Sequence, residues 1–223
     1  MMEFFDCIET RRSYRAFTPE HVSQETLENI CKAANRSPSY MNTQPWEVFV
    51  AAGAQKTALA AQLRELAEAD EPARPDLPFP TNFPKAMADR AETHRTDRAE
   101  ALDLDPHGDG KQMRMNFLAN FDFYGAPCVL FVGMPKSFSP WSVFDLGAFT
   151  NGLLLALHAE GLGGVPQAMP VGYPDVIRRE LGVSDDTLIV LAVSIGYPDH
   201  DAAINRYRST RKAPDTFIHW YGF

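Results

Sequence analysis

Arginine side chains gather near both ends of the 223-residue chain, beside hydroxyl residues that could bind the same ligand. Guanidinium groups bind phosphate through paired hydrogen bonds, and Ser or Thr hydroxyls can complete the coordination of its oxygens. If the fold brings the two ends together, the two stretches form one phosphate pocket; otherwise they are separate, solvated surface patches. The N-terminal stretch contains Arg11, Arg12, Ser13 and Arg15, and the C-terminal stretch contains Arg206, Arg208, Ser209, Thr210, Arg211 and Lys212.

A second polar group lies in the sequence RSPSYMNTQPWEVFV, residues 36–50, just before an expected strand. The carboxamides of Asn42 and Gln44 each offer a donor and an acceptor, which suits a planar ring with carbonyls and ring nitrogens. Both amides reach one ligand only if a turn aims them to the same side. In the alternative interpretation, Pro38, Ser39 and Asn42 simply form the turn between a helix and the strand.

Composition restricts the classes of function. A formal charge of −8 argues against a general nucleic-acid or membrane-surface binder, so an anionic ligand needs a local basic cluster. The three cysteines are far apart, with no CxxC pair, and the six histidines show no metal-binding spacing. We therefore expect no metal, a reducing cytoplasmic location and no membrane insertion. GLGGVP at 161–166 follows a helix, unlike the glycine loop of a dinucleotide-binding domain.

The elements that must position these groups follow from hydrophobic periodicity. Strands are expected at 47–52, 126–134 and 187–198, and helices separate them. The expected helices include one that ends near Arg12, one capped by Ser23, and others at 54–69, 143–164 and 173–182. This alternation predicts a single domain, residues 1–223, with helices around a central sheet.

The segment from about 70 to 120 differs in texture from the rest of the chain. Five prolines between 72 and 84 forbid a regular element there. A polar helix is expected over 85–104, followed by a second helical piece at 113–121. Such an insertion in a compact domain is either a lid over a site or a disordered excursion.

Taken in order, the stretches RRSYRAF, SPSYMNTQPWEVFV, YGAPCVLFV, DLGAFTNGLLLALHAEGLGGVPQAMPVGYPDVIRRELGV, LAVSIGYPD and NRYRSTRKAPDTFIHWYGF resemble the FMN-dependent nitroreductase family. The resemblance covers most of the chain except about 55–125. It implies an α+β fold with a central mixed β-sheet flanked by helices, in an intertwined homodimer. Each of its two FMN sites would then be built from both chains.

The resemblance also implies roles for individual positions. Arg11 or Arg12 would meet the FMN phosphate, Arg15 would lie near the pyrimidine side of the ring and stabilise reduced flavin, and Gln167, Ala168 and Met169 would lie along the isoalloxazine. The partner subunit would supply Pro38, Ser39 and Tyr40. The remaining implied contacts are Ser13 in the first flavin segment, Asn42 and Gln44 at the ring or ribityl chain, and Arg208 and Arg211 as the phosphate clamp.

Two departures from the family pattern leave alternatives open. Arg211 stands three residues before Pro214 where members often have two, so Lys212 could share or replace its role. The chain also has no clear counterpart of a further ring-contacting asparagine found in some members, for which Asn82 and Asn116 are the candidates.

The implied activity is reduction of nitroaromatic compounds or quinones by NAD(P)H, with both substrates using one site in ping-pong order. Because FMN carries the chemistry, no side chain need act as a catalytic acid or base. The alternatives are a reductive dehalogenase or flavin-fragmenting enzyme of the same fold, and a protein that stores FMN without turnover. The residues expected to shape the choice of the small-molecule acceptor are Phe79, Phe83, Phe123 and Tyr124.

Overall fold

The computed structural model describes residues 2–106, 108 and 110–223, and its centre is a four-stranded sheet of order β1-β2-β4-β3. All three pairs of neighbouring strands are antiparallel, so the prediction of a mixed sheet is wrong for this sheet. Strands β2 and β3 do run in the same direction, but β4 lies between them and pairs antiparallel with both. Within the described residues, the parallel pairing is confined to one isolated bridge, between Ser13 and Gly164. The strands are β1 (Glu47–Ala52), β2 (Cys128–Pro135), β3 (Gly163–Gln167) and β4 (Thr187–Gly196).

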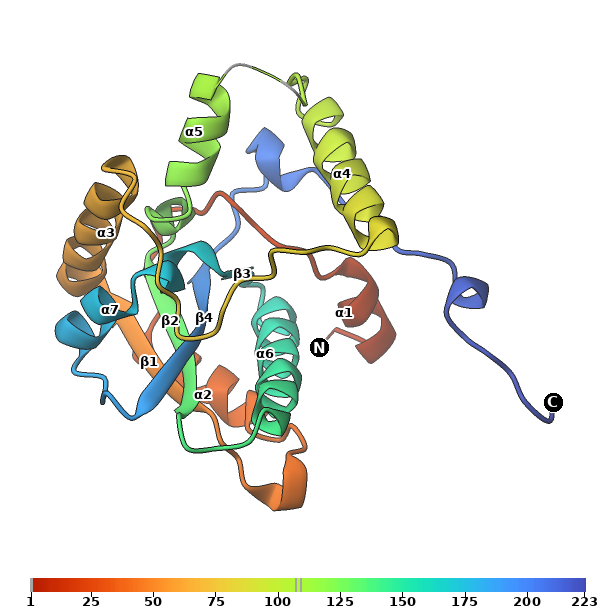
Figure 1. Ribbon diagram of the computed structural model, residues 1–223, viewed down its shortest axis with the longest axis horizontal. Helices are drawn as coiled ribbons and strands as arrows, with labels where there is room; N and C mark the ends of the chain where they lie inside the picture. Colours follow the sequence, from red (N-terminus) through yellow and green to blue (C-terminus); the bar gives the residue numbers. More distant parts are fainter. Residues whose placement is uncertain (1, 107, 109) are drawn as a thin grey trace.

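Alternation along the strands divides the core between the two faces of the sheet (Figure 1). Successive side chains of a strand point to opposite faces, so a buried central strand can serve two cores at once. Residues 128, 130, 132 and 134 of β2 join the cluster under α2 and α6, whereas residues 129 and 131 join the cluster under α3 and α7. These helices are α2 (Gln24–Ala34), α3 (Gly53–Glu68), α6 (Trp141–Ala159) and α7 (Pro174–Leu181).

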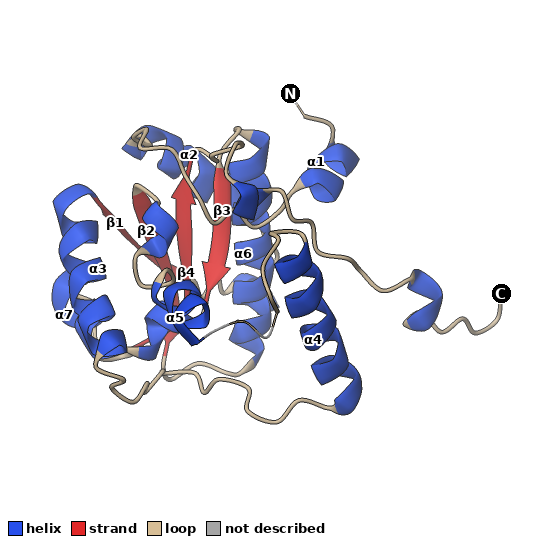
Figure 2. Cartoon of the chain, turned by 90° about the horizontal axis from the view of Figure 1, so that it is seen from above, coloured by secondary structure: helices blue, strands red, loops and turns tan. Residues whose placement is uncertain are grey.

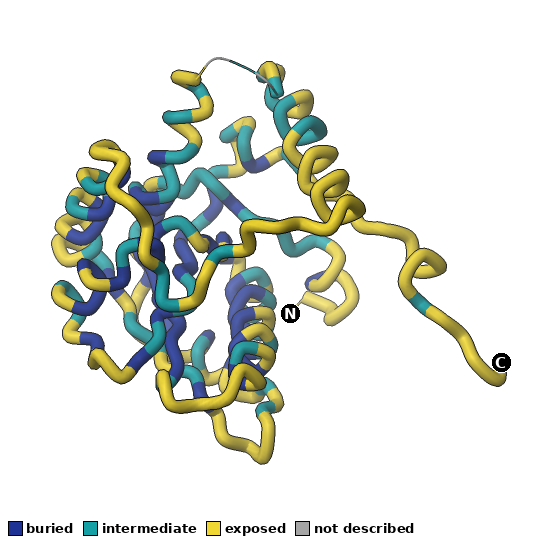
Figure 3. Tube along the Cα trace, viewed as in Figure 1, coloured by how far each residue is buried: buried dark blue, intermediate teal, exposed yellow. Residues whose placement is uncertain are grey.

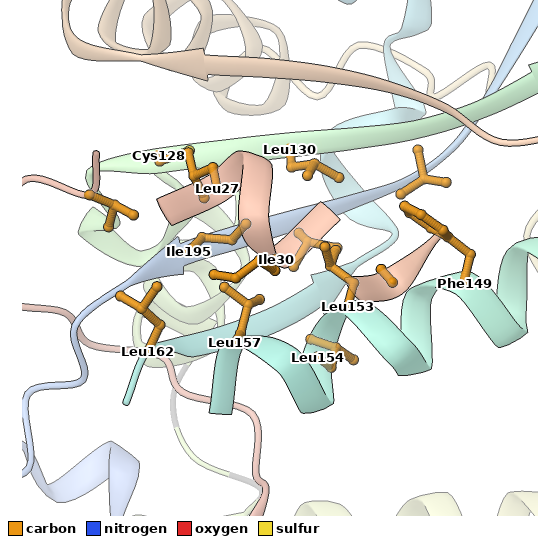
Figure 4. Packing of buried hydrophobic residues seen from close by; sticks show 14 of the residues in the cluster. Leu27, Ile30, Cys128, Leu130, Phe149, Leu153, Leu154, Leu157, Leu162 and Ile195 are labelled. Atoms are coloured by element: carbon orange, nitrogen blue, oxygen red, sulfur yellow. The ribbon is translucent and has the colours of Figure 1, made fainter. Parts of the chain in front are cut away.

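Helix α6 is the main support of the first cluster. Leu153 and Leu157 are fully buried, and Figure 4 shows them directed toward Ile30 of α2 and Ile195 of β4. Within the described chain, α6 is also the one helix that could cross a membrane by length and composition. Its packing here is that of a core helix, although Trp141 and Phe144 near its start remain exposed.

Several local predictions agree with the structure. The Ser23 hydroxyl accepts a hydrogen bond from the Thr26 backbone N–H at 3.0 Å and caps α2, as expected. Strand β1 has the predicted bounds, and α7 ends at Gly182, which adopts the left-handed conformation with φ of 66°. Strand β3 was not predicted, because its sequence GGVPQ carries two glycines and a proline.

The segment from 70 to 120 has an anchored part and a projecting part. The buried Arg178 of α7 contacts the Asp76 carboxylate at 2.5 Å, and the Asp76 carboxylate also accepts a hydrogen bond from the Ile189 backbone N–H at 2.8 Å. Beyond Pro84, α4 (Lys85–Glu100) has no buried residue, and α5 (Gly110–Leu118) buries Leu118. Figures 1 and 3 show α4 standing away from the sheet with its outer surface exposed.

Both chain termini lie on the same side of the molecule. Helix α1 (Phe4–Thr10) packs against the end of α6, and the chain after β4 returns beside it through the short helix Ala203–Asn205. Figure 2 shows the last residues leaving the body as an extended arm, which includes the short helix Pro214–Thr216. The remaining short helices are Tyr40–Asn42, Phe123–Gly125 and Met169–Gly172.

Candidate functional site

The fold brings the two arginine stretches to one cavity of about 530 Å³. Its lining includes five arginines and one carboxylate residue, Glu9, so the positive charge far exceeds the negative charge. Hydroxyl groups lie beside the cations, as a phosphate-binding surface requires. The lining residues are Ile8, Glu9, Thr10, Arg11, Arg12, Ser13, Arg15, His94, Tyr207, Arg208, Ser209 and Arg211.

A buried asparagine joins the two stretches. The side-chain oxygen of Asn205 accepts a hydrogen bond from the Arg15 backbone N–H at 2.7 Å. Its side-chain nitrogen donates to the backbone oxygens of Ala16 at 2.8 Å and Asp199 at 2.7 Å. Asn205 is 3% exposed, so each of these bonds satisfies a group that water does not reach easily. Sequence analysis missed Asn205, although it stands just before the second arginine stretch.

The two adjacent N-terminal arginines differ in their contacts. Arg12 donates to the Tyr14 hydroxyl at 3.3 Å and to the Asn205 backbone oxygen at 3.2 Å, and its guanidinium lies over the Tyr14 ring. Burial and the nearby Arg211 cation lower the pKa of Arg11. Arg12 is therefore occupied by the fold, and Arg11 is the better placed of the two to meet an anion with Arg211.

The contacts of the C-terminal cations distinguish Arg211 from Lys212. Arg211 lines the cavity, and its Nη1 donates to the Ser209 hydroxyl at 2.7 Å and to the Thr210 backbone oxygen at 2.9 Å. The Lys212 ammonium instead lies 4.6 Å from the centre of the Phe217 ring, outside the cavity lining. This arrangement favours Arg211 over Lys212 as the anion-binding residue.

Helix α1, which directly precedes the first arginine stretch, is attached to the C-terminal end of α6. The Thr10 hydroxyl and the His158 Nε2 form a 2.8 Å hydrogen bond, and the Cys7 thiol approaches the Leu155 backbone oxygen at 3.5 Å. Burial lowers the pKa of His158, and the cations of Arg11 and Arg12 lower it further. His158 is thus a structural link between α1 and α6.

The polar elbow at 36–50 lies at the opposite end of α6. The Tyr40 backbone N–H donates to the Asp145 carboxylate, with contacts of 3.2 and 3.3 Å. The 13 residues from Asp145 to His158 correspond to about 20 Å along a helix axis. Within one chain, the elbow therefore does not line the arginine cavity. The predicted site residues that lie outside this cavity are Pro38, Ser39, Tyr40, Asn42 and Gln44.

The elbow is a sharp turn, and its amides remain accessible. Asn42 and Gln44 have positive φ values of 58° and 48°, uncommon for residues with side chains. The Gln44 side chain donates to the Asn42 backbone oxygen at 3.1 Å, and both residues are exposed. The Ser39 hydroxyl accepts from the Gln44 backbone N–H at 3.0 Å and stabilises the turn.

The loop at 167–169 begins with a side chain directed into the core. Gln167 is 3% exposed; its amide nitrogen donates to the Asn120 backbone oxygen at 2.9 Å, and its amide oxygen accepts from the Ser194 hydroxyl. Ala168 is exposed and Met169 is half-buried. The side chain of Gln167 is therefore committed to the fold, and any ligand contact from this residue must come from its backbone.

The four predicted acceptor residues do not share one environment. Phe123 is fully buried, with its ring 6.2 Å from that of Phe131, so its prediction as an acceptor contact is wrong; an apolar ring next to a buried strand joins the core. Phe79 packs half-buried against the second cluster, and Phe83 is exposed. Tyr124 donates from its hydroxyl to the Asn120 side-chain oxygen at 2.9 Å.

A second cavity, of about 260 Å³, lies between α4 and α5. His94 belongs to the linings of both cavities, which places the two spaces side by side. Of the two candidate asparagines, Asn116 lines this second cavity, whereas Asn82 is exposed in the irregular segment before α4. In the described residues there is no group of three or more His, Cys, Asp or Glu side chains that could hold a metal ion.

Comparison with known proteins identifies the family to which this chain belongs. The model of the nitroreductase family matches residues 8–197, which is most of the chain. The chain belongs to the nitroreductase family. The resemblance inferred from the ordered stretches is thereby confirmed, and with it the α+β fold of this family.

Several nitroreductase relatives are similar over nearly the whole chain. A 4-nitrobenzoate reductase of Pseudomonas putida is 32% identical over 99% of this chain and 96% of that protein. The crystal structure of the FMN-dependent nitroreductase NfnB from Mycobacterium smegmatis in complex with NADPH superimposes with a TM-score of 0.91, at 30% identity and 96% coverage of both chains. A more distant relative, an iodotyrosine deiodinase of Thermotoga neapolitana, is 27% identical over 89% of this chain and 90% of that protein.

Proposed function

We propose that this nitroreductase family member is an FMN-dependent enzyme that uses NAD(P)H to reduce nitroaromatic compounds or quinones. The observation that carries the proposal is the arginine-rich cavity built from both ends of a chain of this family. Relatives described as an FMN-dependent nitroreductase in complex with NADPH and as a 4-nitrobenzoate reductase support the same activity. The three free cysteines fit a reducing, cytoplasmic location.

The cavity fits the phosphate of FMN. Arg211 lies close enough to Arg11 for its cation to lower the pKa of Arg11, so a phosphate between the two guanidinium groups would remove that repulsion. Arg208 and the hydroxyls of Ser13 and Ser209 lie in the same lining and supply further donors. Arg12 would contribute through Tyr14 and Asn205, by holding the segment in place.

Assembly as a homodimer would complete the site. The elbow and the arginine cavity lie at opposite ends of α6, so a two-fold axis beside this helix can bring the elbow of one chain to the cavity of its partner. Pro38, Ser39, Tyr40, Asn42 and Gln44 would then reach the ring and ribityl chain. Exposed apolar side chains support this interface, since isolated soluble chains seldom leave so many large rings in water. They include Phe4, Phe5, Trp141, Phe144, Trp220 and Tyr221.

FMN, when bound, would supply the redox chemistry by accepting a hydride from NAD(P)H and passing electrons to the acceptor. The chain would supply position and charge. Arg15 would stabilise negative charge on the pyrimidine side of the ring, and the backbone at Ala168 and Met169 would offer donors along it. Phe79, Phe83 and Tyr124 would shape the space that NAD(P)H and the acceptor use in turn.

The test is anaerobic mixing of the purified, flavin-loaded protein with NADPH or NADH. We expect the flavin absorbance to bleach and to return when a nitroaromatic compound or a quinone is added, with ping-pong kinetics in the steady state. A protein that holds FMN but is not bleached by either nucleotide would instead be a flavin-storage protein. A protein that purifies without flavin and does not bind it would overturn the proposal.

A second candidate activity is reductive dehalogenation, because iodotyrosine deiodinases are among the relatives. The same reduced protein can be mixed with iodotyrosine and the released iodide measured. Iodide release at a rate above that of nitro-group reduction would make dehalogenation the principal activity, and its absence would leave nitroreduction.

A further inference from the structure

The junction between the two cavities carries a cation, Arg98, that neither the fold nor the proposed flavin site uses. Arg15 lines the arginine cavity, Arg98 lines the cavity between α4 and α5, and His94 lines both. Neither guanidinium takes part in an ion pair with a described residue, although other arginines of the chain do. Arg98 and Arg15 line neighbouring cavities and lie close enough to repel each other, so an anion beside Arg98 would relieve that repulsion.

The electrostatics agree with the geometry. Burial lowers the pKa of Arg98, and the neighbouring Arg15 cation lowers it further. Burial and the cations of Arg15, Arg98 and Arg211 also lower the pKa of His94. His94 is held at this point by a 3.0 Å hydrogen bond between its Nδ1 and the Tyr207 hydroxyl.

The cavity beside this cationic junction has an apolar wall. Ala99, Leu102, Leu104 and Met113 contribute to the lining. Its one carboxylate residue, Asp105, has an interaction partner of its own. A ligand suited to such a space carries a flat apolar body and one anionic group, because the wall favours the first and the cations favour the second.

We propose that Arg98, with His94 beside it, forms a subsite that binds the carboxylate of an aromatic acceptor, such as a nitrobenzoate, while Arg15 remains on the flavin side of the junction. The subsite rests on the proposed function, since it assigns the acceptor class of the same flavin enzyme. The phosphate of NADPH carries the same kind of charge and is the competing occupant. Its adenosine and sugar groups would have to occupy a 260 Å³ apolar space, which favours the smaller aromatic acid.

The matched substitutions are Arg98→Gln and Arg90→Gln, both on α4. Arg90 is exposed and lies outside both cavity linings, so its variant controls for the loss of one positive charge. Arg98→Lys retains the charge and tests whether the cation itself is recognised. Flavin absorbance of each purified variant reports that the protein is folded and loaded.

The decisive measurement is the ratio of kcat/KM for 4-nitrobenzoate to that for neutral nitrobenzene. We expect Arg98→Gln to lower this ratio about 10- to 100-fold, the range for loss of a charge-assisted hydrogen bond, and Arg90→Gln to leave it near the original value. Arg98→Lys should recover part of the loss. Benzoate, which cannot be reduced, should bind the resting protein more weakly by a similar factor in the Arg98→Gln variant.

Other outcomes separate the competing explanations. An unchanged acceptor ratio with a reduced preference for NADPH over NADH in Arg98→Gln would assign the cations to the nucleotide phosphate and overturn the carboxylate subsite. Unchanged ratios for both substrates would overturn the subsite altogether. Failure of the unsubstituted protein to reduce nitrobenzene, 4-nitrobenzoate and a quinone would instead contradict the proposed function, whatever the benzoate binding shows.

Discussion

The backbone N–H of Arg15 donates to the side-chain oxygen of Asn205 at 2.7 Å, across 190 positions of sequence. This bond and the two that the Asn205 amide donates tie the N-terminal arginine stretch to the chain that follows β4. The arginine cavity exists because of this connection. A residue that carries no charge and reaches no ligand thus determines whether the cations converge.

Replacing Asn205 by alanine should weaken both the fold and the flavin site. The change leaves the Arg15 N–H and the Ala16 carbonyl without their partner, at a cost of about 1–3 kcal/mol for each unsatisfied buried group. Urea unfolding should show a lower free energy of unfolding, and FMN titration a weaker Kd. Asn205→Asp keeps the acceptor for Arg15 but sets a carboxylate oxygen against the backbone oxygens of Ala16 and Asp199, so it should also lower the free energy of unfolding. Equal FMN affinity in all three proteins would contradict the assigned role.

Arg211 and Lys212 should differ in their effect on the phosphate. Arg211→Ala should weaken FMN binding about 10- to 100-fold, because a charge-assisted contact with the phosphate is lost. Riboflavin lacks the phosphate, so its affinity should change far less. Lys212→Ala serves as the control, since its ammonium lies on the Phe217 ring outside the cavity. Equal losses for FMN and riboflavin in Arg211→Ala would place Arg211 away from the phosphate.

The sequence predicted best those features that depend on near neighbours. Alternation identified β1, a continuous apolar run identified β2, and the Ser23 cap fixed the start of α2. Strand β3 escaped prediction because its stability comes from pairing with β4 rather than from its glycines and proline. Phe123 was misassigned because composition cannot distinguish an aromatic residue of the core from an aromatic residue that lines an acceptor site.

Long-range contacts account for the remaining differences at the site. The sequence singled out both arginine stretches, which line one cavity, but it could not show that Arg12 is bound by Tyr14 and Asn205 while Arg11 lies near Arg211. The strand order presents the same limit: β4 enters between β2 and β3, so the sheet is antiparallel although the family resemblance implied a mixed sheet. Such choices depend on partners that lie far away in the sequence.

The Asp76–Arg178 pair should be among the strongest single contributions to stability. Both side chains are largely buried, so Asp76→Ala would leave the Arg178 guanidinium without its close partner and remove the acceptor for the Ile189 N–H. Breaking one side of a buried pair costs about 3–5 kcal/mol. Asp175→Ala is the matched control, because its carboxylate is 93% exposed and lies 3.8 Å from Arg178. If the urea midpoints of Asp76→Ala and Asp175→Ala fell equally, the Asp76–Arg178 pair would not make the large contribution to stability assigned to it.

His158 should make stability depend on pH in a defined direction. Its pKa is lowered in the fold, whereas an unfolded chain returns it to about 6.5. Between the lowered pKa of the folded protein and 6.5, the unfolded chain binds more protons than the folded one. The free energy of unfolding therefore falls as the pH is lowered through and below 6.5, and well above 6.5 it does not depend on His158. Flavin-free protein is the appropriate sample, since a bound phosphate would favour the charged ring. Urea unfolding from pH 7.5 to 5.5 should show a smaller decline in the free energy of unfolding for His158→Gln than for the unsubstituted protein. His94→Gln removes a second histidine with a lowered pKa, on α4, and measures how much of the decline His94 causes. If the free energy of unfolding fell equally with pH in His158→Gln and in the unsubstituted protein, the 2.8 Å Thr10–His158 contact would not explain how α1 is held against α6.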